Sequence, residues 1–343
     1  MSKLKVAIIG CGRISYKHAE ALINNINEAE LVAVCDIVED KAGERKKQYE
    51  NAIEDNASVK VYSDYIQMLE KEDIDVVSIC TESGYHAKHA IDCLNKGKHV
   101  LVEKPMALSI KEADEMIRIS KEKNLKLGIC YQNRFNPPIQ KLRRAIEEGR
   151  FGKLINGTAR ILWTRDDKYY KQATWRGTKA LDGGTLMNQC IHNIDLLQWM
   201  MNSEIERVHC ERGTFLRDIE MEDFGAILIR FKNGAIGIVE GSACVYPKNL
   251  EETLSIFGEK GTVVIGGVAV NEIKVWKFAD KRDNRDLESL NEVAIDSVYG
   301  YGHTPLYKDF IDAINNNEEP LINGEEGKKA MEIVLKAYMR SVI

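Results

Sequence analysis

The chain has 343 residues, of which 44% are hydrophobic, and this is enough for two domains with buried cores. Its net charge of −5 comes from interspersed charges of both signs, which excludes the clustered basic surface of a nucleic-acid-binding protein. None of its apolar runs approaches the roughly 20 residues that a membrane-spanning helix needs.

The cysteines and the first residues predict where the protein resides. The strand-like run LKVAIIG (4–10) begins at once, so we expect no signal peptide. Eight cysteines are scattered without a C-x-x-C pair, which predicts reduced thiols in the cytoplasm and no zinc site. His86 and His89 lie three residues apart on an expected helix. We interpret them as cofactor-edge and surface residues, and we expect no bound metal.

The first 130 residues alternate between short apolar strands and amphipathic helices. Apolar strands without polar alternation indicate a parallel sheet that is covered on both faces. The repetition of strand and helix predicts a doubly wound Rossmann domain over residues 1–130. The expected strands are 4–10, 31–36, 59–62, 75–81, 99–103 and 125–130, and the expected helices are 14–25, 39–50, 65–71, 87–97 and 110–124.

The pattern changes after the helical segment 137–152. The following strands alternate more clearly, and Asn-Gly at 233–234 predicts a hairpin between two of them. We therefore expect an α+β domain over residues 131–343, with a largely antiparallel open sheet. Its expected strands are 153–163, 205–215, 223–231, 235–245, 252–258 and 262–267, and its closing helices are 304–316 and 325–341.

The stretch GCGRIS (10–15) is a candidate dinucleotide loop. Gly10 and Gly12 match the first two glycines of the G-x-G-x-x-G fingerprint, while Ser15 replaces the third. Such a loop brings backbone N–H groups to a pyrophosphate at a helix N-terminus. Asp36 ends the second strand, where a carboxylate accepts from the ribose hydroxyls of NAD and repels the 2′-phosphate of NADP. We expect NAD as the cofactor, against the alternative of a tight turn without a ligand.

A second candidate site lies on LDGGTLMNQCIHNIDLLQW (181–199), which reads as one helix entered through two glycines. Asn188, His192 and Asp195 are spaced i, i+4 and i+7, so they would share one helix face. The alternative for His192 is an ordinary buried histidine. Asp195 is expected to orient the helix or His192.

The triplet EKP (103–105) follows the fifth expected strand, at the sheet edge where ligands bind in open α/β folds. Taken alone, it is compatible with a plain turn. Together with GKHVLVEKPMALS (97–109), GCGRIS (10–15), ICTESGYHAKHAIDCL (79–94) and the helix after the two glycines, it resembles the glucose–fructose oxidoreductase/inositol dehydrogenase (Gfo/Idh/MocA) family over nearly the whole chain.

The resemblance implies a catalytic pair of Lys104 and His192, which must converge on one substrate alcohol. An imidazole is a suitable base near neutral pH, and an ammonium group stabilises the alkoxide as it forms. The expected cofactor-binding residues are Gly10, Gly12, Arg13, Ile14, Asp36, Thr81, Glu82, His86, Glu103, Lys104, Gln132, Trp175 and Arg176. The expected substrate-binding residues are Lys104, Arg134, Arg165, Tyr169, Asn188, His192 and Tyr301.

One position departs from the common family pattern. The family usually has Asp four residues before the catalytic histidine, whereas this chain has Asn188, and an amide cannot act as a base. The segments 134–154, 163–201 and 301–314 resemble the branch that oxidises nucleotide-linked uronates, which implies hydride transfer from C3 of UDP-N-acetylglucosaminuronate. Such a substrate carries about three negative charges, and Arg134, Arg165 and Arg176 near the expected cleft offer guanidinium forks that suit them.

Two alternatives remain open at this stage. The substrate of the same chemistry could be a free polyol, such as an inositol or an aldose. The chain could instead be a dinucleotide-binding regulator that performs no chemistry. The family resemblance also implies a homodimer or homotetramer.

Overall fold

The computed structural model describes residues 2–53, 58–267, 269–280, 282 and 300–340. The chain divides into two compact units: residues 1–131 with 303–328, and residues 132–302 with 329–343. The segment from His303 thus packs with the first unit, although it follows the second unit in the sequence. The expected assignment of 1–130 to the cofactor and 131–343 to the substrate stays a prediction.

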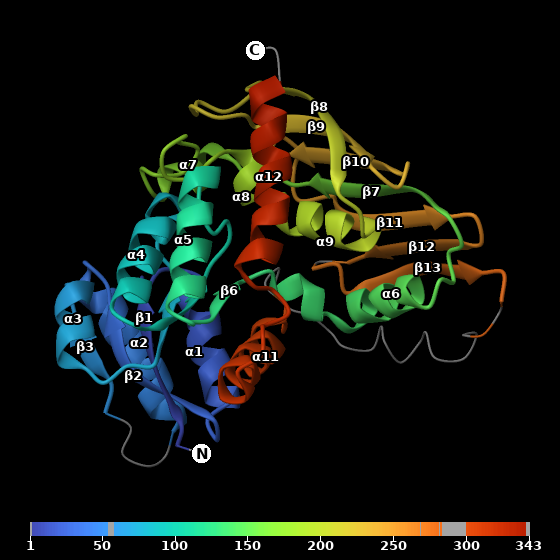
Figure 1. Cartoon of the computed structure of the whole chain (residues 1–343). Coiled ribbons are helices and arrows are strands. Elements are labelled where there is room, and N and C mark those ends of the chain that lie inside the picture. Colours follow the sequence, from blue (N-terminus) through green and yellow to red (C-terminus); the bar gives the residue numbers. More distant parts are fainter. Residues whose placement is uncertain (1, 54–57, 268, 281, 283–299, 341–343) are drawn as a thin grey trace. The chain divides into compact units, whose positions relative to one another are not determined.

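The first unit contains the predicted parallel sheet (Figure 1). Its strand order is β3-β2-β1-β4-β5-β6, and all five strand pairs are parallel. The order reverses between β1 and β4, which is the point where open α/β sheets bind ligands. The strands are β1 (Leu4–Ile9), β2 (Ala29–Cys35), β3 (Lys60–Tyr62), β4 (Val76–Ile79), β5 (His99–Val102) and β6 (Leu127–Ile129).

Helices connect these strands, and several begin with side-chain caps that the sequence supplies. The Asp64 carboxylate accepts hydrogen bonds from the N–H groups of Ile66 and Gln67. Ser109 and Glu112 form a reciprocal capping pair at the start of α5. Helix α1 packs against α2 and α11, and α4 packs against α5. The helices are α1 (Ser15–Asn24), α2 (Glu39–Ala52), α3 (Tyr65–Lys71), α4 (Ser83–Asn95), α5 (Ile110–Glu122) and α11 (His303–Asn316).

The second unit contains a seven-stranded sheet in the order β13-β12-β11-β7-β10-β9-β8. Among the strand pairs of this sheet that the structure describes, β7 and β10 alone are parallel, so the predicted largely antiparallel character is confirmed. The predicted hairpin joins β9 and β10, with Gly234 at a φ of +88°. The strands are β7 (Leu154–Leu162), β8 (Ile205–Gly213), β9 (Phe224–Phe231), β10 (Ile236–Ser242), β11 (Glu251–Gly258), β12 (Gly261–Gly266) and β13 (Glu272–Phe278).

One helix of this unit packs closely on the sheet. Helix α9 contacts β7, β10 and β11 (Figure 1). Gly157 of β7 allows this approach, because a Cβ there would lie 2.6 Å from Met201 and 2.7 Å from Leu197. The helices of this unit are the 3₁₀ helix η1 (Gln132–Phe135), α6 (Pro137–Glu147), α7 (Asp167–Lys171), α8 (Thr185–Asn188), α9 (Ile191–Met201) and α12 (Gly324–Arg340), whose first residues belong to the first unit.

Within the described part of the chain, no helix combines the length and the apolar character that a bilayer crossing requires. All eight cysteines are free thiols, and only Cys244 is more than marginally exposed.

Candidate active site

The glycine loop after β1 has one position that only glycine fits and one that is open. Gly10 has a φ of +88°, and a Cβ there would lie 2.7 Å from the backbone of Cys80 and Thr81. At Gly12, a Cβ would meet no heavy atom within 4 Å outside its chain neighbours. The Ser15 hydroxyl donates to the Gly12 carbonyl over 2.7 Å, so this side chain closes the turn where the fingerprint has its third glycine.

Asp36 lies beside this loop, directly after β2. One carboxylate oxygen accepts the Cys11 N–H at 2.7 Å, and the other accepts the Val38 N–H at 2.8 Å. The carboxylate is therefore fixed at the carboxyl end of β2 and remains half-buried. Its expected contact with the ribose hydroxyls stays a prediction.

His86 braces two strand ends in the first unit. Its Nδ1 lies 2.7 Å from the Pro105 carbonyl oxygen, and its Nε2 lies 3.0 Å from the Thr81 carbonyl oxygen. Burial lowers the pKa of this imidazole, and the two carbonyl groups oppose the change. His86 thus connects the end of β4 to the EKP segment after β5. Thr81 and Glu82 lie at the same strand end and are half-buried.

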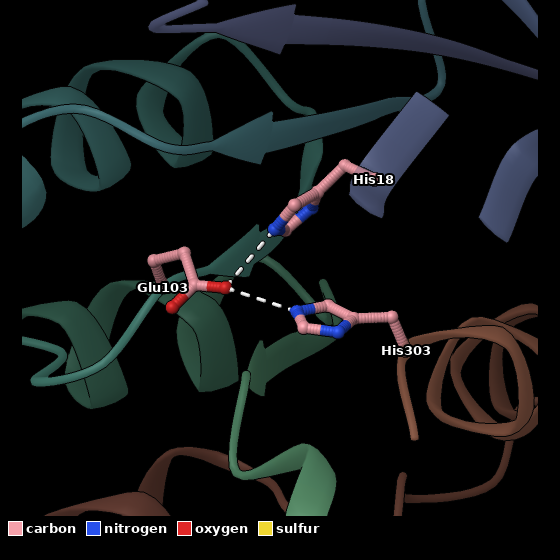
Figure 2. A group of neighbouring side chains, drawn as sticks. All are labelled: His18, Glu103 and His303. Carbon is pink, nitrogen blue, oxygen red and sulfur yellow. Dashed lines mark hydrogen bonds and ion pairs between the residues drawn. The ribbon is translucent and has the colours of Figure 1, made fainter. Parts of the chain in front are cut away.

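Glu103 is the centre of a buried cluster that no local pattern predicted (Figure 2). Its Oε1 accepts from His18 Nε2 at 3.0 Å and from His303 Nε2 at 3.3 Å. His18 comes from α1, and His303 is the first residue of α11. Burial alone would raise the pKa of Glu103, but the hydrogen bonds from the two histidines outweigh it and hold that pKa well below its usual value.

The same three side chains are the one group in the described residues whose ligand atoms, all within 4.8 Å of one another, could hold a cation. In the present geometry they satisfy one another, because both imidazoles point their Nε2 atoms at one carboxylate oxygen. The expectation that no metal is bound stays a prediction.

In the second unit, the predicted single helix over 181–199 is wrong, because the segment forms two helices. Helix α8 ends at Asn188 and α9 begins at Ile191. The Cys190 N–H bonds to the Thr185 carbonyl, five residues back, and this wider turn interrupts the ladder of bonds four residues apart. Asn188 and His192 therefore lie on different helices, and both side chains are half-buried.

Asn188 is oriented by a carboxylate. Its amide donates to Asp182, whose other oxygen accepts the Gly177 N–H at 2.7 Å. Gln189 donates to the Asn188 carbonyl oxygen at 3.1 Å. Asp182 is only 5% exposed, so the amide of the half-buried Asn188 supplies a donor to a buried carboxylate, whereas a second carboxylate at position 188 would repel it.

Two arginines of the expected site lie against the ring of Tyr169. The Arg176 guanidinium carbon is 4.2 Å from the centre of the Tyr169 ring, and that of Arg165 is 5.1 Å away. Arg176 also donates to the Tyr169 hydroxyl. Gln189 joins the group, since it accepts from Arg165 at 2.8 Å and donates to the Tyr169 hydroxyl at 3.0 Å. The guanidinium of Arg176 also lies 4.6 Å from the centre of the Trp175 ring.

Arg134, also expected at the substrate, is instead engaged in the core of the second unit. Its Nε and Nη2 donate to the two oxygens of Asp195 at 2.8 and 2.6 Å, and neither residue is exposed. The guanidinium lies over the ring of Trp199 at 4.8 Å. Both partners are closed to solvent, so this pair connects η1 to α9 inside the second unit. The expected roles of Arg134 at the substrate and of Asp195 in orienting the helix or His192 stay predictions.

The remaining expected residues differ in exposure. Lys104, directly after Glu103, is half-buried, and Gln132 is buried in η1. Tyr301 is 51% exposed. Arg13 is exposed and Ile14 is half-buried, between Gly12 and α1.

Sequence reasoning missed three residues that these networks use: His18, Asp182 and Gln189. Asp182 stands next to the paired glycines and could have been noticed there. The only hint for His18 is a histidine among apolar residues of an amphipathic helix.

Family models match most of the chain. One, described as an oxidoreductase family with an NAD-binding Rossmann fold, matches residues 4–131. Another, described as the GFO/IDH/MocA C-terminal domain, matches residues 139–264.

Individual relatives cover nearly the full chain. The structure is similar to that of the WlbA dehydrogenase from Bordetella pertussis in complex with NADH and UDP-GlcNAcA, with 36% identity, a TM-score of 0.90, and coverage of 98% of this chain and 95% of that one. The corresponding WlbA structure from Chromobacterium violaceum has 36% identity, a TM-score of 0.88, and coverage of 98% and 93%. Myo-inositol 2-dehydrogenase from Thermotoga maritima is 29% identical over 96% of this chain and 93% of its own length.

Proposed function

The chain belongs to the GFO/IDH/MocA oxidoreductase family and is an NAD-dependent enzyme that acts on CH–OH groups of sugars, and on this premise we propose that it oxidises C3 of a UDP-linked N-acetylhexosamine uronate. The observation that carries the proposal is the pair of guanidinium groups at Tyr169. Two arginines held beside one aromatic ring suit a substrate with carboxylate and phosphate groups. The two WlbA relatives, crystallised with UDP-GlcNAcA, also support it.

The reaction needs a base for the hydroxyl proton and a positive group for the developing alkoxide. We assign the base to His192 and the stabilising ammonium to Lys104. NAD, when bound, would accept the hydride from the same carbon. We place the dinucleotide at the glycine loop, where the open side of Gly12 leaves room for it and Asp36 stands beside the loop.

The test follows NADH absorbance with UDP-N-acetylglucosaminuronate as the substrate. A second reaction contains 2-oxoglutarate as hydride acceptor and measures 2-hydroxyglutarate, in case the protein retains its cofactor. Turnover in either reaction supports the proposal. Absence of both signals, with protein that binds NADH, would exclude this substrate.

Variants at Lys104 and His192 test the chemistry. Lys104→Ala and His192→Ala should each abolish turnover while NADH binding, measured by fluorescence titration, stays within a few-fold of wild type. Unchanged turnover in either variant would remove that residue from the mechanism. Loss of turnover with intact NADH binding also counts against a regulator without chemistry.

Inositol oxidation is the second candidate, because the Thermotoga maritima relative is a myo-inositol 2-dehydrogenase at 29% identity. Arg165→Gln separates the two substrates, because Arg165 is expected at the substrate alone, whereas Arg176 is also expected at the cofactor. It should lose activity on the UDP-uronate, while an uncharged polyol would be turned over as before. Arg160→Gln is the matched control, because Arg160 pairs with Glu240 and Glu251 on the sheet and has no assigned role at the site.

The assembly and the location are also proposals. We propose a homodimer or homotetramer in the cytoplasm. Light scattering during size-exclusion chromatography tests the first, and cell fractionation tests the second.

A further inference from the structure

We propose that His18 and His303 are positioning residues that hold the Glu103 carboxylate in one orientation and thereby place Lys104 for catalysis. This inference rests on the proposed role of Lys104. It concerns the buried cluster of Figure 2, to which neither the family match nor the relatives assign a function.

Two hydroxyl groups face His18 Nδ1, that of Ser78 at 2.7 Å and that of Tyr307 at 2.9 Å. The Tyr307 hydroxyl also lies 2.9 Å from Ser78 Oγ, to which it can donate. With its Nδ1 facing these hydroxyl groups, His18 donates from Nε2 to the Glu103 carboxylate at 3.0 Å. Ser78 and His18 are both 0% exposed, so no solvent competes for these bonds.

His303 supplies the second donor from the other end of the chain. It is 2% exposed, and its Nδ1 is buried with no hydrogen-bond partner among the described residues. Burial lowers its pKa, so the ring is neutral at physiological pH and carries its proton on the Nε2 that faces Glu103. The bond to Glu103 is thus the polar contact that orients this ring. In this orientation the buried Nδ1 has no hydrogen-bond partner among the described residues, which costs free energy.

Glu103 passes this orientation to the next residue. Its Oε2 accepts the backbone N–H of Lys104 at 3.2 Å, while its Oε1 holds the two histidines. The carboxylate therefore fixes the peptide from which the Lys104 side chain leaves. A catalytic group displaced by about 1 Å can lose up to about 100-fold in rate. Rigid support of the Glu103–Lys104 peptide therefore raises the rate of turnover by keeping Lys104 in place.

Few groups around the Glu103 cluster change their charge near neutral pH. Burial raises the pKa values of the neighbouring thiols and phenol well above their usual values, so these groups stay neutral. The titratable and charged groups that face the cluster are Cys80 from the end of β4, His86 from α4, Lys104, Cys130 after β6, Tyr307 from α11 and Lys17 from α1.

The test compares His303→Gln with His303→Leu, and His18→Gln with His18→Leu. The amide nitrogen of glutamine replaces the imidazole Nε2 as a donor, whereas leucine removes it. We expect the glutamine variants to keep kcat within about threefold of wild type. The leucine variants should lose about 10- to 100-fold in kcat with little change in the KM for NAD.

The pH profile is the readout that a merely structural role would not move. Without one donor, the pKa of Glu103 rises, so the carboxylate protonates at a higher pH. Protonation of the proposed base His192 lowers kcat at acid pH in wild type as well, so the kcat of the leucine variants should begin to fall at a higher pH than that of wild type. Equal kcat values and identical pH profiles for the leucine and glutamine variants would overturn the inference.

Two further measurements keep the outcomes distinct. If the leucine variants fail to fold, Tyr307→Phe carries the test. It removes the hydroxyl group that faces Ser78 Oγ and His18 Nδ1. The decline of kcat at low pH should then shift in the same direction as in the leucine variants, but by less. Wild-type turnover in Lys104→Ala would instead remove Lys104 from the mechanism and overturn this inference, whereas absence of turnover of the UDP-uronate by wild type would refute the proposed function. A stoichiometric metal ion in the purified protein that is lost in His303→Leu would overturn the hydrogen-bonded arrangement.

Discussion

Arg134 and Asp195 form a two-pronged ion pair that is fully closed to solvent, with contacts of 2.8 and 2.6 Å. Removing one partner leaves a buried charge without its counter-ion, which costs about 3–5 kcal/mol. Arg134→Met should therefore lower the free energy of unfolding by that amount in urea titrations. Arg134→Met/Asp195→Leu should recover most of the loss. A single variant of wild-type stability with a raised KM for the substrate would instead show that Arg134 binds substrate.

Glu252 should make stability depend on pH. Burial raises its pKa to about 8, and its Oε2 has no hydrogen-bond partner among the described residues. The folded protein keeps this proton between about pH 4.5 and 8 while the unfolded chain releases it, so the contribution of Glu252 to stability falls as the pH rises through this window. Glu252→Gln should be the more stable protein at pH 8 by a few kcal/mol, and the gap should close near pH 5.

Thermal unfolding across this pH range measures the effect. Glu206→Gln, at an exposed position of β8, is the matched control and should follow wild type. A constant difference between Glu252→Gln and wild type at every pH would contradict the prediction.

The two glycines of the dinucleotide loop should respond differently to alanine. Gly10→Ala places a Cβ against the backbone of Cys80 and Thr81 at a positive φ, so it should destabilise the fold and abolish NAD binding. Gly12→Ala meets no protein atom and should leave the melting temperature within a few degrees of wild type. Because the ligand would occupy that side, its affinity for NADH should fall about tenfold or more. Unchanged NADH affinity in Gly12→Ala would place the dinucleotide elsewhere.

Asn188→Asp should introduce a new pH dependence. The added carboxylate would face Asp182 at hydrogen-bond distance, and two such groups cannot both ionise at low cost. At low pH they would share a proton and preserve the contact, whereas at high pH they would repel. We expect kcat/KM of this variant to decline about tenfold relative to wild type between pH 6 and pH 9. The swapped variant Asn188→Asp/Asp182→Asn restores one amide and one carboxylate, and should remove the decline.

Local patterns were sufficient for most of the secondary structure. The six strands of the first sheet are short apolar runs between amphipathic helices, and this pattern has few alternatives. The segment 272–278 was not predicted as a strand, because charged residues interrupt its apolar alternation, yet it pairs with β12 at the sheet edge. The break after Asn188 was missed because the apolar spacing continues through it, while a backbone bond to Thr185 interrupts the helix.

The residues of the candidate site also differ in how well the sequence predicted them. Asp36 was found from its spacing to the glycines, and the structure brings it to Cys11. The cluster around Glu103 was not predicted, because His18 and His303 lie 85 and 200 positions away from Glu103 in the sequence. No periodicity connects such distant positions, and the fold alone brings them together.

The place of His303 in the first unit has a consequence for synthesis on the ribosome. Glu103 and His18 emerge early, but the donor that completes their cluster follows the whole segment up to Gly302. A nascent chain that ends at Tyr131 has the full parallel sheet and still lacks α11, so the nucleotide-binding unit reaches its final hydrogen-bonded state only when translation is nearly finished.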